Sequence, residues 1–135
     1  MPESKEVEKR KKLTASMEDY LEAVDALRKK KGIARVRDIS ALLGVKNSSV
    51  NAAVGVLANK GFVVHERYGY VDLTPAGEEI AREVQSRHDT LIKFLTNILH
   101  VDHKTASIDA CRMEHAMGPQ TFAKLKQFVR LHKRR

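Results

Sequence analysis

The chain has 135 residues, of which 42% are hydrophobic, enough for one ordinary core or for two small units that pack on each other or on a second subunit. Lys and Arg number 25 against 17 Asp and Glu, so the formal net charge is +8, which is typical of proteins that bind a polyanion. No apolar run approaches the roughly 18 residues of a membrane span, and the leading residues MPESKEVEKRKK lack the apolar stretch of a signal peptide. We therefore expect a cytoplasmic protein with no membrane partner and no small-molecule substrate.

Residues 1–12 are charged and poor in apolar side chains, so we expect a disordered leader. Apolar residues at helical spacing then predict three helices. The first covers residues 16–31 with Ser16 as its N-cap, and the second covers residues 36–43. The third is capped by Asn47 or Ser48 and ends at residues 59–61.

The pattern then changes to that of β-strands. Residues 62–66 and 70–73 form two short β-type runs, and Arg67-Tyr68-Gly69 between them has the length and glycine content of a hairpin turn. Three helices followed by a hairpin are the order of a winged helix-turn-helix. The fold class expected is therefore mainly α with a small β-hairpin.

The second half of the chain is predicted to be helical. A long helix begins at Thr74-Pro75, with a break at residues 100–102, a further helix over residues 104–117 and a last one over residues 121–132. The long helix carries an apolar stripe that a unit of about 60 residues cannot hide alone, so we expect a homodimer. That stripe ends with Leu91, Phe94, Leu95 and Ile98.

The third helix has the composition of a DNA recognition helix. In a helix-turn-helix the N-terminal end of this helix enters the major groove, where short polar side chains reach base edges and nearby cations hold phosphates. The alternative is a capping sequence on a solvated helix. The candidate DNA-binding residues are Arg35, Arg37, Lys46, Asn47, Ser48, Ser49, Asn51 and the wing residue Arg67, with Lys60 as a further phosphate contact.

A second group of residues has the chemistry of a metal site. Asp19 and Glu22 are three residues apart on the first helix, His88 lies on the long helix, and Cys111, Glu114 and His115 follow the spacing C-x-x-E-H. Carboxylate, imidazole and thiolate together suit a first-row transition ion rather than Ca(II) or Mg(II). Taken singly, each has an ordinary alternative: a solvated acidic face, a surface or core histidine, and a buried apolar cysteine.

Together these motifs resemble the diphtheria toxin repressor family of metal-dependent repressors. The resemblance runs from about Leu13 to Leu125, through SMEDYLEAV, VRDISALLGVKNSSVNAAVGVLANKGFV, YGYVDLTPAGEEIA, SRHDTLIKFL and ACRMEHAM. It implies a homodimeric repressor that binds operator DNA, with a winged helix-turn-helix domain over residues 13–74 and an all-helical metal-binding and dimerisation domain over residues 75–135. It also implies a metal corepressor and control of metal-homeostasis genes.

The resemblance is to a hybrid of two branches of this family. Asp19 and Glu22 match the manganese-responsive branch, whereas Cys111 matches the iron-responsive branch. Ile92 and Ser107 stand where the iron branch has the glutamate and histidine of its ancillary site, and the chain ends before that branch's SH3-like domain. His88, Glu114 and His115 match both branches.

The ligand set favours Fe(II), because a thiolate is a softer donor than a carboxylate and Mn(II) is the weakest binder of the divalent series. Mn(II) remains an alternative, as do one or two ions per subunit. Two other classes of protein stay open: a metal-independent winged-helix regulator, and a small metalloenzyme that uses Glu114 as a general base. We do not expect an enzyme, since nothing in the sequence supplies a substrate pocket.

Overall fold

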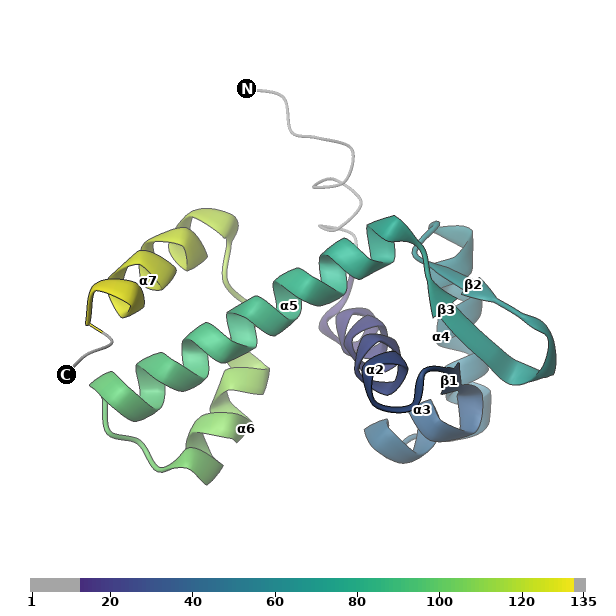
Figure 1. Ribbon diagram of the computed structural model, residues 1–135, viewed down its shortest axis with the longest axis horizontal. Helices are drawn as coiled ribbons and strands as arrows, with labels where there is room; N and C mark the ends of the chain where they lie inside the picture. The colour runs from purple at the N-terminus through teal and green to yellow at the C-terminus, as the bar shows by residue number, and fades with distance from the viewer. Residues whose placement is uncertain (1–12, 133–135) are drawn as a thin grey trace, which may run out of the picture. The chain divides into compact units, whose positions relative to one another are not determined.

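The computed structural model describes residues 13–132, so the expected leader at residues 1–12 lies outside the described part of the chain. The molecule is mainly helical with one small antiparallel sheet, as predicted, and it divides into two compact units, residues 1–82 and 83–135 (Figure 1). Among the described residues, no single helix is both long and apolar enough to cross a membrane; one bent pair of short helices passes that test of length and composition together.

The first unit begins with α2 (Ala15–Lys31). Its N-cap is Thr14, whose hydroxyl accepts a hydrogen bond from the backbone N–H of Met17 at 3.1 Å. The prediction that Ser16 caps this helix was therefore wrong, because Ser16 already lies in the first turn. At the other end, Gly32 adopts a φ of 80° and donates its N–H to the carbonyl of Arg28, which ends the helix as expected.

The helix-turn-helix consists of α3 (Val36–Leu43), with the bounds that the sequence predicted, and α4 (Asn47–Asn59), which ends where predicted but begins one or two residues earlier. Gly44 closes α3 with a φ of 67°. The N-cap of α4 is Lys46, whose side chain makes no capping hydrogen bond, so the prediction that Asn47 or Ser48 caps this helix was wrong. Both residues already belong to the first helical turn, which leaves their side chains available for other contacts.

The predicted hairpin is present and belongs to a three-stranded sheet. Strands β2 (Val63–His65) and β3 (Tyr70–Leu73) are antiparallel and are joined by a short 3-10 turn, η1 (Arg67–Gly69). A third strand, β1 (Ala34–Arg35), pairs with the other edge of β3, so the order is β1-β3-β2. The sequence analysis missed β1, because two residues are too short for any periodicity to mark.

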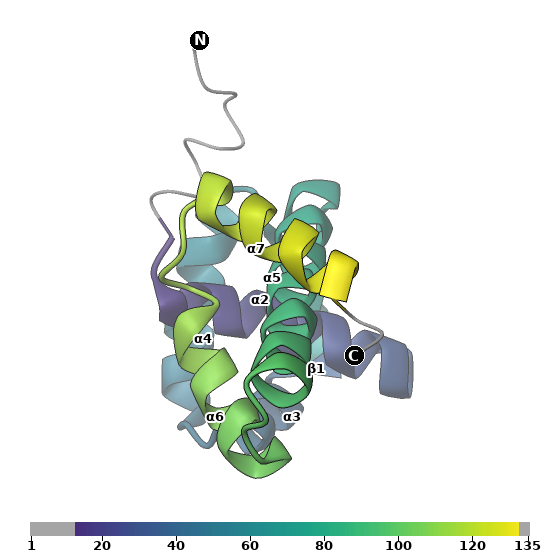
Figure 2. The same cartoon turned by 90° about the vertical axis from the view of Figure 1, so that its left-hand side faces the viewer.

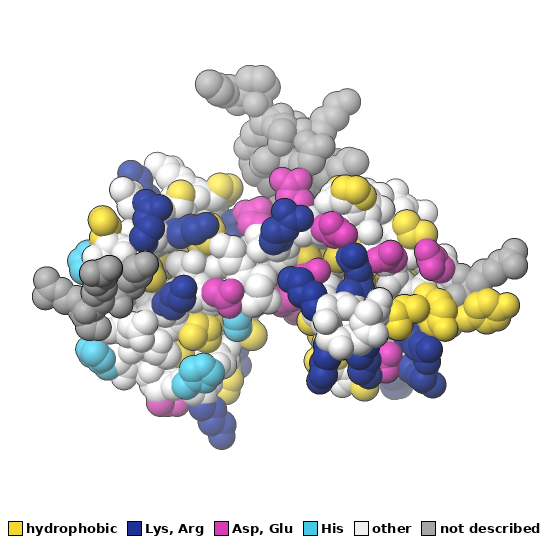
Figure 3. Space-filling view, in the orientation of Figure 1, with side chains coloured by type: hydrophobic (Ala, Val, Ile, Leu, Met, Phe, Trp, Pro, Cys, Tyr) yellow, Lys and Arg dark blue, Asp and Glu magenta, His cyan; other side chains and the backbone are white. Residues whose placement is uncertain are grey.

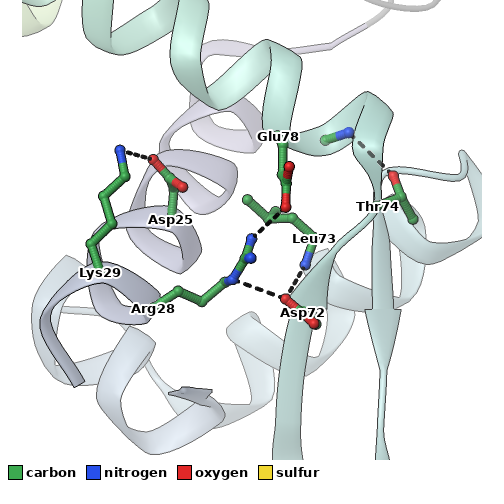
Figure 4. Close-up of polar contacts among 8 residues, drawn as sticks. Asp25, Arg28, Lys29, Asp72, Leu73, Thr74 and Glu78 are labelled. Carbon is green, nitrogen blue, oxygen red and sulfur yellow. Dashed lines mark hydrogen bonds and ion pairs between the residues drawn. The ribbon is translucent and has the colours of Figure 1, made fainter. Parts of the chain in front are cut away.

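Arg28, in the last turn of α2, joins three elements of the first unit. Its Nε lies 3.0 Å from Oδ1 of Asp72 on β3, and its Nη1 lies 3.1 Å from Oε1 of Glu78 on α5 (Pro75–Lys93) (Figure 4). Asp72 Oδ1 also accepts the backbone N–H of Leu73. The first helix, the wing and the start of the long helix are thus held together by one guanidinium.

The start of α5 lies directly against the backbone of the wing. Thr74 accepts the N–H of Gly77 with its hydroxyl at 3.2 Å and donates that hydroxyl to the carbonyl of Gly61 at 2.7 Å. A Cβ atom on Gly77 would lie 2.0 Å from the carbonyl oxygen of Phe62, a buried core residue. Only glycine permits this approach of the helix to the strand.

The second unit contains the rest of α5, a π-helical turn η2 (Phe94–Ile98), α6 (His103–Met113) and α7 (Pro119–His132). Helices α6 and α7 lie on two sides of the end of α5 (Figure 2). Asp102 is the N-cap of α6, and its hydrogen bonds to Thr105 hold the pKa of its carboxyl below the usual range. Helix α6 ends at Met113 rather than at residue 117, and α7 begins at Pro119 rather than at residue 121.

The core of this unit is built from Leu91, Leu95, Ala106 and Ala110, with Leu125 of α7 packed against it. The expectation that Leu91 and Leu95 form the dimer surface was therefore wrong, because the chain's own α6 and α7 cover these side chains. Other large apolar side chains of the unit are exposed: Leu99, Ile108, Phe128 and Leu131.

Candidate metal centre and nucleic-acid interface

Three of the predicted metal ligands come together in the second unit. His88 lies on α5, Cys111 on α6 and Glu114 directly after α6. The Nδ1 atom of His88 is 3.4 Å from Oε2 of Glu114 and 3.9 Å from Sγ of Cys111. One donor atom from each residue lies within 4.8 Å of the other two, which is close enough for all three to bind a single ion.

Glu114 lies at the centre of this cluster and is only 1% exposed. It is the C-cap of α6, and its backbone N–H bonds to the carbonyl of Ala110 at 2.9 Å. Its second carboxylate oxygen, Oε1, lies 3.6 Å from Nε2 of His115. A buried carboxylate between imidazoles and a thiol is costly to ionise without a cation, so this donor set fits a divalent metal.

Cys111 is exposed on α6, so the interpretation of this residue as a buried apolar cysteine is wrong. An exposed thiol beside an imidazole and a carboxylate is accessible both to a metal ion and to oxidants. His115 follows Glu114 in the turn after α6 and is partly buried. The C-x-x-E-H motif therefore spans the end of a helix rather than one continuous helical face.

Asp19 and Glu22 lie on α2 in the first unit, three residues apart and half-buried. This spacing places both carboxylates on one side of the helix, as expected. Their participation in the same centre as His88 stays a prediction.

The predicted base-reading residues are all exposed at the start of α4: Asn47, Ser48, Ser49 and Asn51, with Lys46 just before them. Val50, Val54 and Leu57 on the other side of the helix are buried and fix its orientation. Arg37 is exposed on α3, and Lys60 is half-buried at the end of α4. Lys and Arg side chains gather along the edge of the first unit that carries α3 (Figure 3). Their contacts with DNA stay predictions.

Arg35 has a structural role that the sequence did not indicate. Its Nη2 lies 3.4 Å from the hydroxyl of Tyr70, and its guanidinium lies 5.2 Å from the centre of the Tyr70 ring. Because Arg35 is on β1 and Tyr70 is on β3, this contact joins the two strands through their side chains as well as through their backbones.

The wing tip contains a residue that the sequence analysis overlooked. Tyr68, between Arg67 and Gly69, is 88% exposed and has a φ of 65°, a left-handed conformation that is rare for a bulky residue. The sequence signal for this residue was a tyrosine directly before a glycine at the tip of the predicted hairpin. The tip therefore presents an exposed aromatic ring.

Two family models together match almost the whole chain. The "Iron dependent repressor, N-terminal DNA binding domain" matches residues 12–71, and the "Iron dependent repressor, metal binding and dimerisation domain" matches residues 74–134.

Relatives of known sequence match over most of their length. A helix-turn-helix transcriptional regulator of Methanocaldococcus jannaschii is 34% identical over 118 residues, which are 87% of this chain and 94% of that protein. The regulator MntR of Lysinibacillus sphaericus is 35% identical over 87% of this chain and 84% of its own. MntR of Bacillus subtilis is 34% identical over 86% of this chain and 81% of its own.

Solved structures of longer proteins share the fold. The T. acidophilum IdeR has a TM-score of 0.72 at 27% identity, over 82% of this chain and 52% of its own. A manganese-dependent transcriptional repressor in complex with manganese has a TM-score of 0.77 at 25% identity, over 84% of this chain and 52% of its own. The chain thus spans about half the length of these two proteins. It belongs to the diphtheria toxin repressor family of metal-dependent transcriptional repressors, which are regulators and not enzymes.

Proposed function

We propose that the chain is a cytoplasmic homodimeric repressor that binds operator DNA when loaded with Fe(II) or Mn(II) and so controls metal-homeostasis genes. Residues 13–74 would form the DNA-binding domain and residues 75–135 the metal-binding and dimerisation domain. The observation that carries this proposal is the convergence of His88, Cys111 and the buried Glu114.

The donor set favours Fe(II) over Mn(II). A thiolate strengthens binding of Fe(II), Co(II) and Zn(II) relative to Mn(II). Mn(II) stays an alternative, since one of the similar structures is of a manganese-dependent repressor in complex with manganese. The two oxygens of Glu114 lie near different imidazoles, His88 and His115, and this arrangement would also allow a carboxylate bridge between two ions.

A repressor that responds to metal needs tighter DNA binding in the loaded state. In this proposal Asp19 and Glu22 on α2 complete the ligand set with His88, Cys111, Glu114 and His115. Helix α2 packs in the same unit as α3 and α4, so its attachment to the dimerisation domain would fix the separation of the two DNA-binding domains in the dimer. That separation must match half-sites about one helical turn apart, ~34 Å. Dimers whose DNA-binding domains are not held at this distance bind more weakly.

The first prediction is that specific DNA binding requires metal. Duplexes selected from a random pool with the Fe(II)-loaded protein under anaerobic conditions should bind at least about tenfold more tightly with Fe(II) or Mn(II) than after chelation. Fluorescence anisotropy at fixed salt measures this, and Mg(II) at the same concentration is the control. Equal binding with and without chelator would instead identify a metal-independent regulator.

The second prediction distinguishes DNA contacts made by α4 and the wing from contacts made by the C-terminal basic residues. Arg67→Ala should weaken binding to all sequences and reduce its salt dependence, since it removes a phosphate contact. Ser48→Ala and Asn51→Ala should change base preference, because these side chains are placed at the N-terminal end of α4. Deletion of residues 133–135 should have a smaller effect on specific binding. Loss of specific binding on that deletion, with silent changes in α4, would contradict the assignment.

A further inference from the structure

Arg87 is a buried charge beside the candidate metal centre. It precedes His88 on α5 and is only 2% exposed. Arginine remains protonated in proteins, and a buried cation is costly unless hydrogen bonds compensate for the lost water. Its burial next to a site for another cation therefore requires an explanation.

The contacts of Arg87 supply one. Its Nη1 donates to the backbone carbonyl of Glu114 at 3.0 Å and to that of Met117 at 2.6 Å. Its Nη2 lies 3.5 Å from Oε1 of Glu83, one turn earlier on α5, and its guanidinium lies 5.3 Å from the centre of the Phe122 ring on α7. The guanidinium thus fastens both ends of the segment 114–117 between α6 and α7.

This segment carries two of the proposed metal ligands. Helix α6 ends at Met113, so the carbonyls of Glu114 and Met117 lie in the turn that follows it. Arg87 donates to both carbonyls and so fixes the backbone from which the side chains of Glu114 and His115 project. We propose that Arg87 is the positioning residue of the metal centre, holding this turn so that both side chains can bind the ion; this inference rests on the proposed function.

The chemistry of arginine matters for this role. A guanidinium presents several N–H donors in a rigid plane, whereas a lysine ammonium is a point charge on a flexible stem. Lysine at position 87 would keep the charge but not the fixed geometry of the contacts to Glu114, Met117 and Glu83. Loss of the charge of Arg87 and loss of its hydrogen bonds should also change the affinity for a metal ion in opposite directions. Removal of a positive charge near the site would by itself strengthen binding of a cation.

The test is an anaerobic Co(II) titration of the full-length wild type, Arg87→Lys and Arg87→Met, with Arg112→Met as the matched control. Arg112 is exposed on α6, next to Cys111, so its loss removes a charge near the site without touching the turn. Both Arg87 variants should bind Co(II) about tenfold more weakly, as when a partner that orients a ligand is lost. Their Co(II) absorption spectrum should also change. Arg112→Met should bind within about twofold of the wild type or more tightly.

Thermal unfolding of the metal-free proteins shows whether each variant folds. If Arg87→Met does not fold, the Co(II) affinity and spectrum of Arg87→Lys test the role of Arg87. A folded Arg87 variant with wild-type Co(II) affinity and spectrum overturns the role of Arg87 alone. An equal loss in Arg112→Met overturns it as well, since the effect would then not depend on the turn. A wild-type chain that binds no Co(II) overturns the proposed function, and the role of Arg87 with it.

Discussion

Replacement of Cys111 by serine should abolish the thiolate-to-metal charge-transfer band of the Co(II) protein and lower its affinity for Co(II) and Fe(II). The Sγ atom lies 3.9 Å from Nδ1 of His88 and is accessible on α6. Serine keeps the size but replaces a strong soft donor with a weak one. We expect the affinity for Co(II) and Fe(II) to fall on the order of a hundredfold, which is the upper end of the effect of losing a residue that only orients a ligand. The affinity for Mn(II) should fall less.

The pH dependence should change in the same variant. A cysteine binds metal as the thiolate, so ligation by Cys111 releases a proton, and protons compete with the ion at low pH. Wild-type affinity for Co(II) should therefore rise with pH more steeply than that of Cys111→Ser. Isothermal titration in buffers of different ionisation enthalpy counts the released protons directly.

Two further observations complete this prediction. Cys111→Glu should shift preference back towards Mn(II), because it replaces the thiolate with a hard carboxylate. Peroxide treatment of the metal-free wild type should reduce its later response to metal, and the same treatment should affect Cys111→Ser less, since serine lacks the oxidisable thiol. An unchanged Co(II) band in Cys111→Ser would remove Cys111 from the site.

The largest expected effect on stability comes from Gly77→Ala. The new Cβ would lie 2.0 Å from the carbonyl oxygen of Phe62 and 3.0 Å from its carbonyl carbon, so the backbone of the helix or the wing must move. Phe62 is buried, and its carbonyl accepts the N–H of Thr74 at 3.1 Å, which leaves little freedom to adjust. Overpacking of this kind should lower the free energy of unfolding by about 3 kcal/mol.

Thermal unfolding followed by circular dichroism measures this effect, with a fall in Tm of roughly 10 °C. Gly55→Ala is the matched control, because Gly55 is also helical and a Cβ there meets nothing within 4 Å. That substitution should leave stability unchanged or raise it by up to about 1 kcal/mol. Similar Tm values for the two variants would show that α5 does not need its close approach to Phe62.

The sequence predicts the long elements of the fold well, because each has many apolar residues at regular spacing. The bounds of α3, the end of α4 and the order of helices and hairpin are examples. Helix ends are less predictable, because a single contact decides them: the Thr14 hydroxyl starts α2, where Ser16 was expected. Strand β1 is defined only by its pairing with β3, a long-range contact that no local pattern contains.

The site could be predicted as a set of residues but not as an arrangement. Residue types and the spacing C-x-x-E-H indicate metal ligands, yet the end of α6 at Met113, before Glu114 and His115, depends on tertiary contacts. Arg87 had no distinguishing sequence signal, since an arginine on a helix is usually solvated. The apolar stripe on α5 was interpreted as a dimer surface because the sequence does not reveal that α6 and α7 cover Leu91 and Leu95.

The central place of β3 in the sheet bears on how the wing could vary among relatives. Both edges of β3 are paired, with β1 through Ala34 and Arg35 and with β2 through Val63 to His65, so its length and register are fixed by two neighbours. The tip, Glu66 and the turn Arg67–Gly69, lies outside the paired strands. Evolution can therefore lengthen or shorten the wing at its tip, by about 3.4 Å for each residue added per strand, without disturbing α3 or α4. The length of the wing can therefore diverge among relatives independently of the helix-turn-helix.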